Sequence, residues 1–481
     1  MASPSLPWRR IIAGIALTLV LAADADGQAR SNPALQSIDR RADHFASLAK
    51  QIWSFAEVGY QEAQSSRLLQ AELAAAGFTV EAGVAGMPTA FLATYGSGQP
   101  VIGILGEFDA LPGLSQDATP TRKALIDGGP GHGCGHHLFG TASAAAAIAV
   151  KEWLAQTGRK GTIRFFGTPA EEGGGGKIYL IRAGHFRDVD AVIAWHPGDV
   201  NQVTRATTLA NITAKFRFKG VSAHAAASPE QGRSALDGVE AMNAMVNLMR
   251  EHVPQETRIH YVITNGGKAP NVVPDVAETY YYARHSDMRI LDGIWERMVN
   301  ASKGAALGTG TTVEMELVNA VYNVLPNDRL ADVAEKALRS VGGFSYTDDE
   351  RRFAETIRTS LTGTLPPIES TGAIAPPEIG VSSGSTDVGD VSWVVPTVQV
   401  TTATWVPGTP AHSWQAVAAG GMSIGTKGML LAAKAMALTA FDLFAEPATL
   451  VATRAEFAKR LGAFRYQTRI GDRQPPLDYR K

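Results

Sequence analysis

One glycine-rich segment of the chain, residues 131–137, brings together side chains that could bind a metal. It contains Cys134, the only cysteine among 481 residues, and His136 lies two positions further on. A thiolate and an imidazole at this spacing can face one ion, because glycines let the backbone wrap closely around it. The same segment is equally compatible with a buried, unreactive thiol in a loop that leads into a helix.

Other candidate ligands follow apolar runs of the kind that form strands. Glu171 and Glu172 come after one such run, His196 after a second and His412 after a third. Each residue alone is more often structural or solvated, but the set suits one or two divalent ions, with Zn²⁺ and Mn²⁺ as natural candidates. Two adjacent glutamates cannot easily bind one ion, so one can ligate while the other moves a proton. That division of labour is metal-assisted hydrolysis.

The elements expected around these residues alternate between strands and helices. Short apolar runs at Val101–Leu105, Thr162–Phe166 and Ala191–Ala194 predict strands, and the Ala-rich segment Thr141–Gln156 predicts a helix. This alternation indicates an α/β domain with a mainly parallel sheet flanked by helices. The candidate ligands fall just after strands or at helix starts, which is the sheet edge where such domains bind their ligands.

The pattern changes between residues 209 and 322. Strands and helices occur there in the order βαββαβ, which is typical of a small, ferredoxin-like sheet of four strands with two helices. Because the α/β pattern resumes afterwards, we interpret this segment as an inserted domain. The prediction is a catalytic domain in two parts, 34–208 and 323–446, followed by a C-terminal tail over 447–481. The polar end of that tail, 472–481, is expected to be loosely held.

The composition is that of an ordinary globular enzyme. Hydrophobic residues make up 45% and charged residues 19% of the chain. The formal net charge is −2, and no long run of like charges occurs. Nucleic-acid binding and polybasic membrane binding are therefore not expected.

The N-terminal segment has the layout of a secretory signal peptide. Trp8-Arg9-Arg10 precedes an apolar stretch over Ile11–Ala23, with small residues at a cleavage site near Ala25. An uncleaved membrane anchor is the alternative, but the apolar run is short for a span. We therefore predict a signal peptide over 1–25, an exported protein in the periplasm or outside the cell, and no stable membrane anchor. A lone thiol there would be buried or masked, and a metal is one such mask.

Six short motifs follow one another along the chain, and both their residues and their order resemble one known family. The resemblance is to the M20 metallopeptidases, in their amidohydrolase branch, and it extends from about residue 35 to 445. That family carries a lid and dimerisation domain where the inserted domain is predicted here. The motifs are Asp109-Ala110-Leu111-Pro112, Gly133-Cys134-Gly135-His136, Pro169-Ala170-Glu171-Glu172, Ser222-Ala223-His224-Ala225, Asn271-Val272-Val273-Pro274-Asp275 and Ala411-His412-Ser413.

Carried over by position, the resemblance implies two divalent ions per subunit, Mn or Zn. Glu171 would act first as general base and then as general acid. Glu107 and Asp109 are expected to orient a ligand histidine rather than bind the metal. The five ligands that the resemblance implies are Cys134, His136, Glu172, His196 and His412.

Residues of the inserted domain also match family positions. His224 matches a residue that reaches the partner subunit's active site and helps to hold the tetrahedral oxyanion. Asn271 and Arg284 match positions near the substrate, where an arginine can clamp a carboxylate. Without the resemblance, His224 is equally a turn residue and Arg284 a surface partner of Asp287.

The resemblance implies an enzyme that releases an amino acid, with glutamate as the leading interpretation, from an N-acyl amino acid such as p-aminobenzoyl-glutamate. His137 supports this substrate, since hippurate-cleaving members usually have Asp at its position. A dipeptidase or aminoacylase of different substrate range is one alternative. A non-catalytic or obligate partner subunit of a heterodimeric hydrolase is another. In each case we expect a dimer, formed with a second copy or with a related subunit.

Overall fold

In the computed structural model of the chain, residues 33–480 are described, so the predicted signal peptide at 1–25 lies outside the described residues. The apolar runs form a seven-stranded sheet in the order β1-β2-β4-β3-β5-β11-β6. Four central strands, β4, β3, β5 and β11, are parallel, and the outer strands are antiparallel to their neighbours. The mainly parallel sheet is as predicted. The strands are β1 (Thr79–Ala82), β2 (Phe91–Ser97), β3 (Val101–Gly106), β4 (Gly161–Gly167), β5 (Ala191–Gly198), β6 (Gln202–Thr204) and β11 (Thr397–Ala403).

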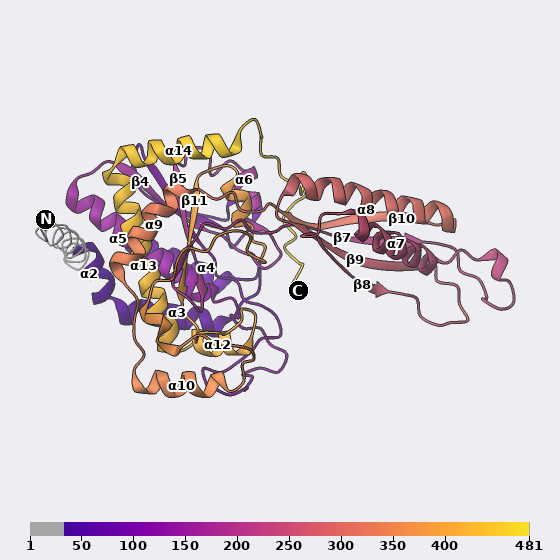
Figure 1. Cartoon of the computed structure of the whole chain (residues 1–481), viewed down its shortest axis with the longest axis horizontal. Coiled ribbons are helices and arrows are strands. Elements are labelled where there is room, and N and C mark those ends of the chain that lie inside the picture. Colours follow the sequence, from indigo (N-terminus) through magenta and orange to yellow (C-terminus); the bar gives the residue numbers. More distant parts are fainter. Residues whose placement is uncertain (1–32, 481) are drawn as a thin grey trace, which may run out of the picture.

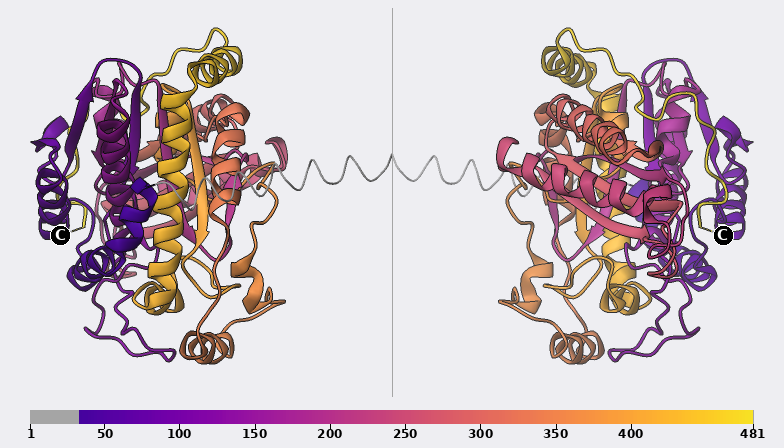
Figure 2. Two further views of the ribbon diagram at one scale, coloured as in Figure 1. Left: turned by 90° about the vertical axis from the view of Figure 1, so that its left-hand side faces the viewer. Right: turned by 90° about the vertical axis from the view of Figure 1, so that its right-hand side faces the viewer.

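Helices flank this sheet, and together they form the domain predicted to be catalytic, which we call the catalytic body (Figure 1). Two of them, α5 and α13, pack against each other and against the central strands, and their small side chains allow close approach. Among the described residues, only α13 has the length and apolar composition of a membrane span, and most of it is buried in the core. The left view of Figure 2 shows α13 in orange-yellow. The helices are α2 (Pro33–Arg40), α3 (Ala42–Phe55), α4 (Ala63–Ala75), α5 (His136–Thr157), α6 (Gly176–Arg182), α9 (Asp328–Val341), α10 (Asp348–Arg358), α11 (Val388–Ser392), α12 (Trp414–Gly420), α13 (Ser423–Ala445) and α14 (Pro447–Leu461).

A second body projects from the catalytic body (Figure 1). Its four antiparallel strands lie in the order β10-β7-β9-β8 and follow the chain order βαββαβ. Apolar side chains of two helices and of one sheet face form a separate core. The elements are β7 (Ala210–Lys219), α7 (Ala235–Met249), β8 (Arg258–Asn265), β9 (Val276–His285), α8 (Met288–Thr309) and β10 (Thr312–Val321).

The part of the chain predicted as a tail is well ordered in this fold. Its first half forms α14, which packs on α9. The remainder, residues 462–480, runs back between the two bodies (Figure 1), and we call it the C-terminal strap. The expectation that the polar end is loosely held is wrong for residues 472–480. Its polar side chains donate hydrogen bonds to main-chain carbonyls of distant segments, which a local pattern does not reveal.

The strap ties the two bodies together. Arg473 donates to the carbonyls of Leu317 and Val318 on β10, the latter at 2.6 Å. Tyr466 donates its hydroxyl proton to the buried carboxyl group of Asp390 at 2.7 Å. One segment therefore holds the projecting body by its last strand and the catalytic body by α11.

The buried carboxyl group of Asp390 makes the stability of this junction depend on pH. Burial raises the pKa of Asp390 to about 7, although Tyr466 and the Tyr322 amide donate to it. The folded chain keeps a proton that an unfolded chain releases from about pH 4 upward, so the stabilisation is complete below about pH 4 and is lost as the pH rises toward 7. Asp390→Asn should therefore flatten the fall in the free energy of unfolding between pH 5 and 7, by up to about 1.4 kcal/mol per pH unit. Denaturant unfolding at several pH values measures this slope. The exposed variant Asp349→Asn serves as control, and an Asp390→Asn slope equal to that of wild type contradicts the account.

Candidate active site

The central strands bring the predicted site residues to one edge of the sheet. Glu107 and Asp109 follow the end of β3, and Glu171 and Glu172 follow the end of β4. His196 lies within β5, close to its carboxyl end. Because carboxyl ends of parallel strands meet at one edge, segments far apart in the sequence converge there.

Cys134 and His136 enter this edge from the start of α5. That helix begins at His136, earlier than the predicted Thr141, because Gly135 takes the left-handed conformation (φ 76°) immediately before it. A Cβ atom on Gly135 would lie 2.7 Å from the Cβ of Pro197, so only glycine allows this approach to the strand that carries His196.

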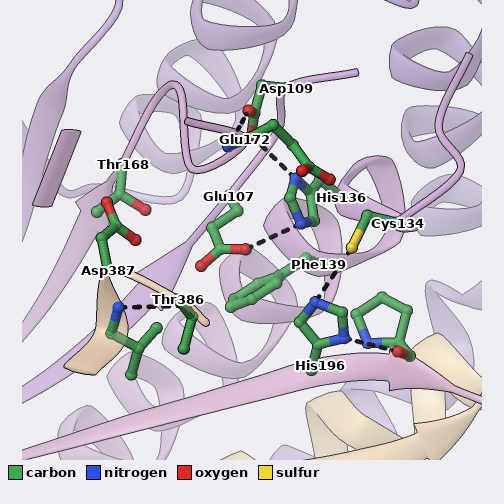
Figure 3. Close-up of polar contacts among 12 residues, drawn as sticks. Glu107, Asp109, Cys134, His136, Phe139, Thr168, Glu172, His196, Thr386 and Asp387 are labelled. Atoms are coloured by element: carbon green, nitrogen blue, oxygen red, sulfur yellow. Dashed lines mark hydrogen bonds and ion pairs between the residues drawn. The ribbon is translucent and has the colours of Figure 1, made fainter. Parts of the chain in front are cut away.

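The first group of candidate ligands is Cys134, His136 and His196, whose donor atoms lie within 4.8 Å of one another. Figure 3 shows the Cys134 thiol directed at the ring of His196, with 3.4 Å between Sγ and Nε2. The other ring nitrogen of His196 lies 2.7 Å from the Pro197 carbonyl, and Nδ1 of His136 lies 2.9 Å from Asp109. In both histidines Nδ1 is thereby engaged away from the cluster, and Nε2 faces other polar groups of the site, Cys134 for His196 and Glu107 for His136, where it could bind a metal.

The second group is Cys134, Glu172 and His412, within the same separation. His412 Nε2 lies 3.2 Å from a carboxylate oxygen of Glu172, and the His412 amide donates to the Gly133 carbonyl at 2.9 Å. Hydrogen bonding to Cys134, then to Glu172, raises the pKa of His412 to about 10. Cys134 belongs to both groups, so one thiolate is available to two ions.

The chemistry of these donors fits divalent metal ions. Although burial alone opposes ionisation, His196 and His136 hold the pKa of the Cys134 thiol well below its usual range. The thiolate, the imidazoles and the Glu172 carboxylate are donors that Zn²⁺ and Mn²⁺ accept. The five residues implied as ligands thus lie together, in two overlapping groups.

Glu171 lies beside the ligands. One of its carboxylate oxygens is within 4.8 Å of a His136 ring nitrogen and of a Glu107 oxygen. Burial, and then the charges of Glu107 and Glu172, raise the pKa of Glu171 well above its ordinary value. Ala170, immediately before it, has the strained backbone angle φ 56°, and such strain is characteristic of functional sites.

A buried lysine that the sequence did not single out supports this arrangement. The ammonium group of Lys177 lies 2.7 Å from Glu107 and 2.6 Å from Asp387, and all three side chains are fully buried. These two carboxylates outweigh the effect of burial and raise the pKa of Lys177. Glu107 also lies 3.1 Å from Nε2 of His136, so the lysine neutralises a carboxylate that touches a candidate ligand. The four glycines before Lys177 mark an unusual backbone segment in the sequence, but they do not reveal that the lysine side chain is buried.

A cleft of about 760 Å³ opens over the cluster. Arg284 lines it and donates to the Ser385 hydroxyl at 3.3 Å, while the alternative partner Asp287 pairs with Arg289 instead. Arg480 of the strap also lines the cleft, and sequence reasoning missed it.

His224 and Asn271 are not brought to the cluster within this chain. Both are exposed and lie beside each other in loops beyond the far end of β7, where Ala225 donates to the Asn271 carbonyl at 3.0 Å. The strand β9 instead runs back toward the catalytic body and carries Arg284, its last residue but one, into the cleft. Of the three predicted residues of the inserted domain, the structure brings only Arg284 to the site.

Comparison with known proteins agrees with this fold. The model of peptidase family M20/M25/M40 matches residues 103–416. The chain is 43% identical to one subunit of the p-aminobenzoyl-glutamate hydrolase of Escherichia coli K12, over 86% of this chain and 92% of that protein. It is 31% identical to the mouse Xaa-Arg dipeptidase, over 89% and 92% of the two chains. A crystal structure of a Bacillus subtilis protein, described as a dinuclear metal binding peptidase of the M20 family, superposes with a TM-score of 0.57 at 17% identity, covering 83% of this chain and 98% of that one.

These matches, with the fold, define the chain as an enzyme that cleaves amide bonds. It belongs to peptidase family M20/M25/M40, whose model covers more than half of the sequence.

The buried charges around Lys177 generate a prediction about stability. Lys177→Met removes the ammonium group that both Glu107 and Asp387 contact and leaves Asp387 buried without its cation, so the free energy of unfolding should fall by about 3–5 kcal/mol. Adding Asp387→Asn should recover part of this loss. The matched control is Lys336→Met, which breaks an exposed pair with Asp442 and should cost less than about 1 kcal/mol. Chemical unfolding of the metal-free protein measures both, and equal losses in the two single variants contradict the account.

Proposed function

We propose that the chain hydrolyses the amide bond of N-acyl amino acids and releases the amino acid. The observation that carries this proposal is the convergence of two ligand groups on Cys134, with Glu171 beside them at the floor of an open cleft. Cys134, His136 and His196 would hold one divalent ion, Zn or Mn, and Cys134, Glu172 and His412 the second. Such ions, when bound, lower the pKa of water and polarise a carbonyl oxygen.

The chain's own residues supply proton transfer and orientation. Glu171 takes a proton from the attacking water and passes it to the leaving nitrogen, and its raised pKa suits a group that must both accept and donate. Asp109 fixes the ring of His136 through Nδ1 and also accepts a hydrogen bond from the Glu172 amide at 2.9 Å. Arg284 binds the carboxylate of the amino-acid part of the substrate.

For the substrate, we propose p-aminobenzoyl-glutamate as the leading candidate. The Escherichia coli relative is named for hydrolysis of this compound, and the similarity spans most of both chains. A dipeptidase is the second candidate, because the mouse relative is named an Xaa-Arg dipeptidase. Both candidates use the same chemistry, and a substrate panel of N-acyl amino acids and dipeptides separates them.

We also propose that the working enzyme is a dimer, with a second copy or a related subunit. His224 and Asn271 lie at the far end of the projecting body, where they could complete a neighbouring site but not their own. The Escherichia coli relative is itself named a subunit. Activity of the purified chain with added Mn²⁺ or Zn²⁺ would exclude an obligate related partner.

The role of Glu171 is tested by the substitution Glu171→Gln. The variant keeps the size of the side chain but not the proton acceptor, so kcat for p-aminobenzoyl-glutamate should fall by about 10²–10⁴-fold. Metal content, measured by mass spectrometry, should stay at the wild-type level. Cys134→Ser is the matched variant for the ligands and should lower the metal content instead. Wild-type turnover in Glu171→Gln would rule out the assignment.

Sharing of His224 between subunits is tested by mixing two inactive variants. A dimer of one Glu171→Gln chain and one His224→Ala chain contains one site with both an intact Glu171 and an intact His224 from its partner. Random re-association should therefore restore about a quarter of the wild-type activity. Absence of recovery in a mixture shown to contain mixed dimers would contradict a shared site.

The location of the mature protein remains a proposal from the sequence. We propose export, because the N-terminal segment has the layout of a signal peptide. N-terminal sequencing of protein recovered from the periplasm or medium would test this proposal.

A further inference from the structure

We propose that Arg480, delivered to the cleft by the C-terminal strap, selects substrates whose released amino acid carries a second carboxylate. This inference rests on the proposed function, in which Arg284 binds the first carboxylate. It assigns substrate selection to a segment that lies outside the matched family region, residues 103–416.

The strap holds Arg480 in a defined place against the catalytic body. The guanidinium group of Arg480 donates to the Glu172 carbonyl at 2.7 Å, and the Tyr479 hydroxyl donates to the same oxygen at 3.1 Å. The Tyr479 ring packs edge-on against Tyr60, with 5.7 Å between ring centroids. A Cβ atom on Gly59 would lie 2.2 Å from the Tyr479 hydroxyl oxygen, so the glycine makes room for this side chain. Gln61 donates to the Leu477 carbonyl at 2.8 Å and fixes the strap just before these residues.

The cleft contains two arginines that form no ion pair with a carboxylate of the described residues. Among residues 33–480, Arg284 and Arg480 are the only arginines or lysines that line it, and neither takes part in an ion pair within that range. The Nε atom of each is buried and has no hydrogen-bond acceptor. The Nε atoms of Arg469 and Arg473 in the same strap also lack an acceptor, but Arg469 is paired with Asp292 and neither of the two lines the cleft. Buried guanidinium donors without acceptors favour an anionic ligand.

Apart from Glu171, Glu172 and Asp387, which belong to the candidate metal site and its buried charge pairs, the cleft contains one further carboxylate that could favour a basic substrate instead. Glu378 lines it and lies beside Thr204 on β6. Arg480 contacts Glu172, which follows β4, and three strands separate β4 from β6 in the sheet. At the usual spacing between strands, β4 and β6 lie roughly 19 Å apart. Glu378 and Arg480 therefore belong to opposite ends of the cleft, so Glu378 does not neutralise the guanidinium group of Arg480.

One guanidinium group suffices for the α-carboxylate that every amino acid carries. A second one, unpaired and partly desolvated, adds a charge-assisted hydrogen bond only when the amino acid has an acidic side chain. Such bonds contribute about 1.5–3 kcal/mol, which corresponds to roughly 10–100-fold in kcat/KM. N-acyl-glutamates or N-acyl-aspartates are thus the class that both arginines fit.

The test compares p-aminobenzoyl-glutamate with p-aminobenzoyl-glutamine, which differ only in the charge of the side-chain end. The full-length, metal-loaded wild type should prefer the glutamate compound by at least about tenfold in kcat/KM. Arg480→Ala should lose that preference, mainly through a higher KM for the glutamate compound, and should change by less than about threefold for the glutamine compound. Arg480→Lys should keep part of the preference because the charge remains. Arg465→Ala, which removes an exposed strap arginine bonded only to nearby carbonyls, should behave as wild type.

Two results would overturn the inference while leaving the proposed function intact. One is a wild type that hydrolyses both compounds equally well. The other is an equal loss on both compounds in Arg480→Ala, which would show that the arginine only positions Glu172. Arg480→Gln, with metal content and thermal unfolding measured alongside, distinguishes these results from misfolding. A wild type that hydrolyses no N-acyl amino acid would instead overturn the proposed function.

Discussion

The thiolate of Cys134 is the constraint on which the rest of the site depends, because it belongs to both groups of candidate ligands. Its position requires three segments to approach within bonding distance: the entry to α5, the end of β5 and the loop that carries His412. Gly135 permits contact with Pro197, and Gly133 lies against the His412 backbone, where a Cβ would be 3.3 Å from the His412 Cα. His412 itself has the strained angle φ 57°. These backbone conformations therefore allow the three segments to approach the Cys134 sulfur atom.

Charge balance behind the ligands is the second constraint. The carboxyl groups of Glu107, Glu171 and Asp387 lie close together. Lys177 is the buried cation that compensates Glu107 and Asp387. Asp387 also lines the cleft, whose wall includes Ser385, the partner of Arg284. One buried lysine therefore connects the carboxylate beside His136 to the loop that holds Arg284 in the cleft. The C-terminal strap also contacts the site, because Tyr479 and Arg480 donate hydrogen bonds to the Glu172 carbonyl.

Much of the fold and of the candidate site could be predicted from the sequence. Parallel strands end at a common edge, so polar residues placed after apolar runs must meet there, and the motifs named the candidate ligands that the structure brings together. The edge strands β1 and β6 were missed because they are short and contain few buried residues. The burial of Lys177 and the position of Arg480 depend on contacts with residues hundreds of positions away, which local patterns do not encode.

The central claim is that one thiolate serves two metal ions. Titration of Co²⁺ into the metal-free protein tests it most directly, because a thiolate bound to cobalt gives a charge-transfer absorption that imidazole and carboxylate ligands do not. The account predicts that this absorption grows with each addition and saturates at about two equivalents per chain, since both ions share the sulfur. Saturation at one equivalent, or cobalt binding without the charge-transfer band, would contradict it.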